Sequence, residues 1–158
     1  MATRRLVRRQ GDGFRLKLTR AEQQYLSGMI DDLRDLLIAE SPASDASVAR
    51  LFPPAYPDDL LQNLDFERTA GSGLLAARLE SLDKATISID APRLSEEDLL
   101  TLMRVVNDLR LVLGTRLSVT EESDPSSFQD EADRSQFVLY QFLGWFISDI
   151  VDALASGD

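Results

Sequence analysis

The chain has 158 residues, of which 44% are apolar and 28% charged, the size and balance of a single globular domain over residues 1–158. It contains no cysteine and no histidine, which excludes disulfides, thiol redox chemistry, histidine-dependent triads and the usual zinc, copper and iron-sulfur sites, and leaves open only a magnesium or calcium site with oxygen ligands. Lys and Arg total 17 against 27 Asp and Glu, a net charge of −10, and such an acidic chain is repelled by nucleic-acid phosphates.

Residues 4–18 predict a β-hairpin. An arginine-rich strand at 5–9 precedes a turn at 10–13, and the strand at 14–18 alternates apolar and basic residues. Six cations form the basic patch of this segment: Arg4, Arg5, Arg8, Arg9, Arg15 and Lys17. Two interpretations stay open, a binding surface for phosphate or an acidic partner, and a solvated face that the acidic remainder of the chain partly neutralises. The arginines of the first strand have no interleaved aromatic residues, which argues against nucleic acid.

The first helix is predicted to begin at Thr19, which fits a capping box with Glu22, and to end near residue 40. A breaker-rich loop over residues 41–45 follows. Prolines at 53, 54 and 57 then favour an extended strap.

Two further helices are predicted at residues 60–69 and 74–84, with the glycines of residues 71–73 permitting a bend between them. Residues 86–89 are β-branched and short, so their pattern does not decide between helix and strand. Pro92 ends the segment in either case.

A helix from Ser95 to about residue 117 is apolar around most of its circumference, which predicts a place at the centre of a bundle. Residues 120–133 are acidic and rich in serine, and predict a mobile surface loop. An aromatic-rich last helix is predicted from about residue 131 to 155. The expected fold is therefore mainly α, an irregular bundle of about five helices with a small N-terminal β-hairpin.

Two motifs, at residues 50–68 and 107–117, resemble the actinobacterial DUF2017 family. The second motif is the more specific, and the resemblance covers nearly the whole chain. It implies an all-helical cytoplasmic protein, and some members of the family are described as regulators of the transcriptional response to oxidative stress. Since this chain has no thiol, sensing through paired cysteines cannot operate here, so any regulation would depend on surface contacts.

The candidate interaction or structural residues of these motifs are Arg50, Phe52, Tyr56, Glu67, Arg68, Asn107, Asp108, Arg110 and Arg116. Arg110 and Arg116 are expected to bridge elements of the bundle by pairing with Glu67 or other carboxylates, because arginine presents five donors in a rigid fork. A recognition face on the central helix is the alternative. Phe52 and Tyr56 are expected to plug the core from the proline-rich strap, with a recognition loop as the alternative.

Phe142 and Trp145 lie at the edge of the apolar stripe of the last helix. Aromatic residues in such positions occur in homodimer interfaces and in ordinary cores. A homodimer that uses this helix therefore stays open.

The sequence indicates no catalytic residue, no metal ligand and no cofactor. We expect a non-enzymatic regulator that acts through protein–protein contacts, with the transcription or stress-response apparatus as its partner. The alternatives are a DNA-binding regulator that uses the basic hairpin and a carboxylate-dependent hydrolase. No apolar run follows the first arginines, and the longest one, at residues 137–147, is about half of a bilayer span, so we expect a cytoplasmic protein without a membrane partner.

Overall fold

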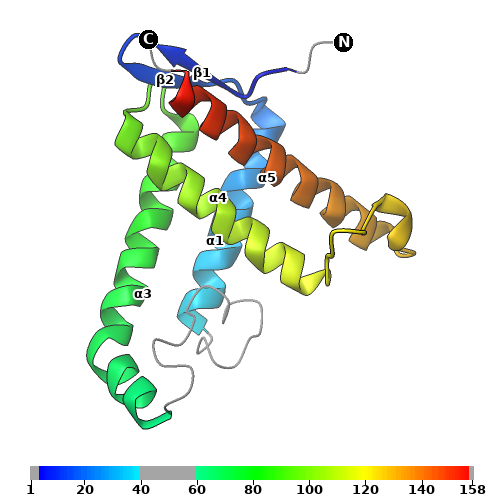
Figure 1. Ribbon diagram of the computed structural model, residues 1–158. Helices are drawn as coiled ribbons and strands as arrows, with labels where there is room; N and C mark the ends of the chain where they lie inside the picture. The colour runs from blue at the N-terminus through cyan, green and yellow to red at the C-terminus, as the bar shows by residue number, and fades with distance from the viewer. Residues whose placement is uncertain (1–3, 40–59, 157–158) are drawn as a thin grey trace.

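The computed structural model describes residues 4–39 and 60–156 (Figure 1). In chain order its elements are β1 (Val7–Gln10), β2 (Gly13–Leu16), α1 (Arg20–Ala39), α3 (Leu60–Asp90), α4 (Glu96–Arg116), the 3-10 turn η1 (Pro125–Ser127) and α5 (Glu131–Ala155). The side chains of α3 are described from Gly73 onward. This part of the chain contains four α-helices and a two-stranded hairpin. The predicted mainly helical fold with an N-terminal hairpin is confirmed, with four helices in place of about five.

α3 is one continuous helix, so the prediction of two separate helices at residues 60–69 and 74–84 was wrong. Glycine lowers helix stability by about 0.5–1 kcal/mol relative to alanine but causes no clash, so the two glycines weaken the helix without breaking it. Residues 86–89 are helical as well. Thr86 is accommodated there because its hydroxyl donates to the Leu82 carbonyl, one turn earlier, at 3.0 Å.

The predicted hairpin is confirmed, although its strands are shorter than expected. β1 and β2 pair antiparallel, from Val7 opposite Leu16 to Gln10 opposite Gly13. Gly11 in the turn has a φ of 62°, a conformation that glycine adopts without strain.

The hairpin is fastened to the connection between α3 and α4. Phe14 and Leu94 exchange backbone hydrogen bonds of 2.9 and 2.8 Å, so Leu94 extends the sheet beyond β2. A Cβ at Gly13 would lie 2.6 Å from Arg93 Nε and 2.8 Å from the Leu94 carbonyl oxygen. Glycine at this position therefore allows the hairpin to approach so closely.

α4 is the central helix, as predicted, with α3 and α5 packed along it (Figure 1). The apolar residues that it buries are Leu99, Leu102, Val105, Val106, Leu109, Val112 and Leu113. Its N-terminus is fixed by a capping box, in which Ser95 and Asp98 exchange two side chain-to-backbone hydrogen bonds of 3.1 Å.

α5 packs along α4 and against β1. Among the described helices, it is the one that is long and apolar enough to cross a membrane by length and composition, although a third of its most apolar window is already buried inside the protein. Asp149 within α5 is 6% exposed and accepts a 2.7 Å hydrogen bond from the Leu6 backbone N–H. We therefore interpret α5 as a core helix.

The acidic segment between α4 and α5 contains ordered local contacts. Asp124 accepts a 2.7 Å hydrogen bond from the Ser126 backbone N–H at the start of η1. The ring of Phe128 lies 5.0 Å from that of Phe137 in α5. The predicted start of the last helix at Glu131 is confirmed, and the mobility of this segment stays a prediction.

Candidate functional site

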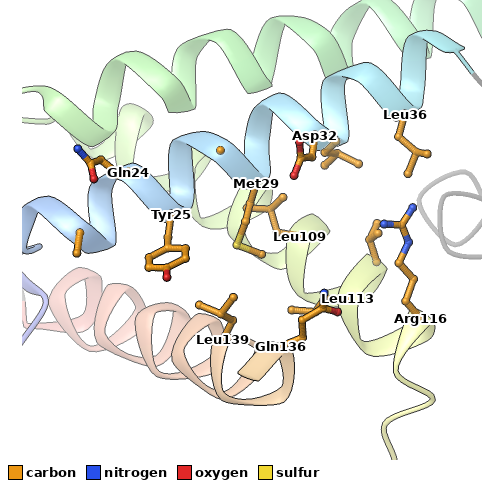
Figure 2. A pocket seen from close by; sticks show the side chains of 14 residues that line it. Gln24, Tyr25, Met29, Asp32, Leu36, Leu109, Leu113, Arg116, Gln136 and Leu139 are labelled. Atoms are coloured by element: carbon orange, nitrogen blue, oxygen red, sulfur yellow. The ribbon is translucent and has the colours of Figure 1, made fainter. Parts of the chain in front are cut away.

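A groove with a volume of about 760 Å³ runs between α1 and α5, with α4 as its floor (Figure 2). Its lining on α1 extends from Ala21 to Leu36, a distance of about 22 Å at 1.5 Å per helical residue. Figure 2 shows Tyr25 and Gln24 toward one end of the groove, with Leu36 and Arg116 at the other. The groove is therefore about four helical turns long.

α1 carries two adjacent apolar rows, and this arrangement creates the groove. The buried row, Leu26, Ile30, Leu33 and Leu37, packs into the core. The second row lies one residue earlier at the same spacing and includes Tyr25, Met29 and Leu36, which line the groove. α1 packs chiefly on α3 and more lightly on α4. Met29 and Leu36 of the second row are therefore half-buried against the core, whereas Tyr25 is mostly exposed.

The apolar side chains of the groove are partly open to solvent. Tyr25 is 60% exposed, and its ring extends from α1 toward α5. Met29, Leu36 and Leu139 are half-buried, whereas Leu109 in the floor is buried. Large apolar side chains that are grouped and accessible in this way are typical of binding grooves.

The lining contains few polar side chains. Besides the Tyr25 hydroxyl they are Gln24, Asp32, Arg116 and Gln136, so Asp32 is its single carboxylate. Among the described residues, no three acidic side chains converge in a way that would hold a metal ion. The arrangement is suited to binding an apolar surface.

Asp108 faces α3 and not the groove. It is 7% exposed and forms an ion pair with Arg78 of α3. Burial raises the pKa of the Asp108 carboxyl above its ordinary value, although the charges of Arg78 and Arg104 and the hydrogen bond from Arg78 oppose this. The structure thus gives Asp108 a structural role, with an α3 arginine that sequence reasoning had not identified as its partner.

Arg110 was expected to pair with a carboxylate, and in the described part of the chain it forms no such pair. Its guanidinium carbon lies 4.5 Å from the centre of the Tyr140 ring, and its Nε is buried without a hydrogen-bond partner. A Cβ at Gly114 would lie 2.9 Å from the same ring, and one at Gly144 would lie 3.4 Å from Arg110 Nε. Arg110 therefore joins α4 to α5 by stacking on an aromatic ring.

The remaining motif residues are dispersed. Asn107 is exposed on α4, away from the groove, and Arg116 lies in the groove lining. Arg50, Phe52 and Tyr56 lie outside the described residues, so the strap prediction is not addressed. Glu67 and Arg68 belong to α3, in the part whose side chains are not described.

Internal contacts hold three of the six cations of the basic patch. Arg4 donates to Glu22 at 2.7 Å and lies 5.8 Å from the centre of the Trp145 ring. Arg5 donates to Asp152 at 2.9 Å. Arg9 lies over the Phe14 ring at 4.9 Å.

Phe142 and Trp145 have partners within the chain. Their rings meet edge to face at 6.0 Å, and Phe142 also stacks with Phe146 at 6.2 Å. These contacts explain both aromatic residues without a second protomer, and a homodimer stays a prediction.

Sequence reasoning missed the groove itself, including Tyr25, Met29, Asp32 and Leu139. The one available signal is the width of the apolar stripe on α1. Ordinary core-facing helices carry three to four apolar residues per two turns as well, so this width does not by itself identify the groove.

A family model described as a domain of unknown function (DUF2017) matches residues 3–154. No curated protein and no solved structure matches the chain.

Proposed function

We propose that this chain, which belongs to the DUF2017 family, is a non-enzymatic regulatory protein that binds a helical segment of another protein in the groove between α1 and α5. The observation that carries the proposal is the second apolar row of α1, with Tyr25, Met29 and Leu36 accessible above the floor of α4.

The apolar lining is large enough to support a specific contact. Fully burying one large apolar side chain contributes about 1.5–3 kcal/mol. A micromolar complex requires about 8 kcal/mol, together with the entropy lost on association. Contacts of Tyr25, Met29, Leu36 and Leu139 with an equal number of partner side chains supply energy of this order.

A helix fits the groove better than an extended peptide. The walls are helices whose backbone groups are already hydrogen-bonded, so they offer nothing to the backbone of a bound strand. A bound helix satisfies its own backbone and places side chains at three- and four-residue spacing along one face. The groove length of about 22 Å corresponds to a helix of about 15 residues.

The electrostatics favour a partner helix with basic flanks. Asp32 lies in the lining and Asp35 is exposed one turn further along α1. Residues 21–158 hold 26 acidic against 10 basic side chains. A lysine or arginine beside the apolar face of the partner would therefore be attracted on approach.

Two finer points belong to the proposal and rest on the family resemblance. These are that the partner is part of the transcription or stress-response apparatus and that the protein acts in the cytoplasm. DNA binding through the hairpin is less well supported, because Arg4, Arg5 and Arg9 are held internally. A carboxylate-dependent hydrolase is also less well supported, because Asp108 and Asp149, the carboxylates buried among the described residues, are held separately by Arg78 and by the Leu6 N–H.

A defined peptide tests the proposal. The probe is a fluorescent 15-residue helix with a leucine face and lysine flanks, and its control has the same composition with the leucines scrambled. We expect the protein to bind the first and not the second. Met29→Glu should weaken binding at least tenfold, about 1.4 kcal/mol. Tyr25→Ala, at a largely exposed position where loss of folding is not a concern, should also weaken it.

Ile87→Glu is the matched control, because Ile87 is 72% exposed on α3 and does not line the groove. It adds the same charge as Met29→Glu, so it should leave binding unchanged. Equal losses in both variants, or equal binding of the scrambled peptide, would show that general charge or hydrophobicity and not the groove controls the interaction.

A further inference from the structure

Arg8 and Arg15 lie directly opposite each other across the hairpin, and both are exposed. Phe14 and Val7 alternate with them along the strands and are buried in the core. The two arginines therefore share the outer face of the sheet. Like charges in directly opposed positions destabilise a strand pair.

Lys17 does not belong to this outer face. Its backbone N–H donates to the Leu6 carbonyl at 2.7 Å, but β2 ends at Leu16, Lys17 is half-buried, and Leu6 beside it is fully buried. Arg8 and Arg15, the outer hairpin face, form no ion pair with the described residues.

Three of the described carboxylates near the hairpin pair with other cations. Asp12 in the turn pairs with Arg93, Glu22 pairs with Arg4, and Asp152 pairs with Arg5. Arg8 and Arg15 thus lie side by side with no carboxylate partner among the described residues, in a chain whose residues beyond the hairpin are strongly acidic.

From this charge arrangement we propose that the outer hairpin face binds a carboxylate-rich segment of a partner protein. This surface is separate from the groove, and the inference does not depend on the groove having an occupant. A nucleic-acid strand fits this face less well, because the face offers no free aromatic ring for base stacking: Phe14 is buried and covered by Arg9.

Two labelled probes test this inference, a 12-residue oligoglutamate peptide and a 12-nucleotide single-stranded DNA. Fluorescence anisotropy over a salt series should show the peptide bound more tightly than the DNA, with an affinity that falls as salt rises. The double variant Arg8→Glu with Arg15→Glu should weaken peptide binding at least tenfold. Arg8→Gln with Arg15→Gln, which removes the charges without adding new repulsion, should also weaken it.

The control double variant is Lys84→Glu with Arg134→Glu, two exposed cations outside the hairpin. It makes the same change in net charge and should alter peptide binding less than threefold. The inference is overturned if the native protein does not bind the peptide, if the control loses as much affinity as the hairpin variant, or if DNA binds as tightly as the peptide.

Discussion

Asp149 in α5 accepts a 2.7 Å hydrogen bond from the backbone N–H of Leu6, a residue 143 positions earlier in the chain. Both residues are buried, so this contact ties the start of the hairpin to the last helix inside the core. Leaving a buried N–H without a partner lowers the free energy of unfolding. We therefore expect this hydrogen bond to contribute more to stability than a nearby exposed ion pair does.

The first prediction concerns this tie. Asp149→Ala leaves the Leu6 N–H without a partner and should lower the free energy of unfolding by about 1–3 kcal/mol. Asp152→Ala, which removes only the exposed pair with Arg5, should cost less than about 1 kcal/mol. Urea denaturation followed by circular dichroism measures both, and equal losses would contradict the assignment of Asp149 as the stronger anchor.

Two helical glycines should respond to alanine in opposite directions. Nothing lies within 4 Å of a Cβ built at Gly28 in the groove wall, so Gly28→Ala should stabilise the protein by about 0.5–1 kcal/mol through helix propensity. A Cβ at Gly114 would lie 2.9 Å from the Tyr140 ring, so Gly114→Ala should displace that ring from Arg110 and lower stability by about 1 kcal/mol. Thermal unfolding compares the two variants, and a gain in both would show that α4 and α5 are less tightly packed than described.

Reversing one charge of the outer hairpin face should raise the stability of the protein and weaken its binding of the acidic peptide. Arg8→Glu places a carboxylate opposite Arg15 and should raise the free energy of unfolding by about 0.2–1 kcal/mol. The same change should weaken binding of the oligoglutamate peptide. A variant that is less stable than the native protein would show that Arg8 and Arg15 do not face each other across the hairpin.

Asp108 should make stability depend on pH. Because burial raises its pKa in the folded protein above the ordinary value of 3.8, its contribution to stability is complete below that value and is lost as the pH rises through the raised pKa. Asp108→Asn lacks this titration. The stability of the native protein relative to Asp108→Asn should therefore fall as the pH rises from acid, as denaturation over a pH series would show. If the stability of the native protein relative to Asp108→Asn rises with pH instead, the ion pair with Arg78 outweighs the effect of burial on the pKa of Asp108.

Local rules account for the parts of the fold that could be predicted. The Thr19 and Glu22 pair marks the start of α1, with backbone hydrogen bonds of 3.1 and 2.7 Å. Alternation marks β2, and the wide apolar surface of α4 marks the central helix. The break predicted between two helices at residues 71–73 is absent, because glycine weakens a helix without ending it.

The groove and the partners of the motif residues could not be predicted, because both depend on how distant helices are placed. Tyr25 of α1 and Leu139 of α5 line the same groove only because of the distance at which the fold places these two helices. Arg78 reaches Asp108 across the α3–α4 interface, and nothing in the spacing of either residue identifies the other. The cations of the basic hairpin were recognised as one patch from the sequence. Which of them form ion pairs within the chain became clear only from the contacts that Glu22 and Asp152 make in the structure.

The most direct test of the groove is photo-crosslinking in the host cell with a benzophenone amino acid at position 25, compared with position 87. We predict that position 25 alone crosslinks a partner through a segment with helical apolar periodicity. That segment, made as a peptide, should bind the native protein and not Met29→Glu. Equal crosslinking at both positions, or a crosslinked segment without that periodicity that binds Met29→Glu as well as the native protein, would contradict a docking groove between α1 and α5.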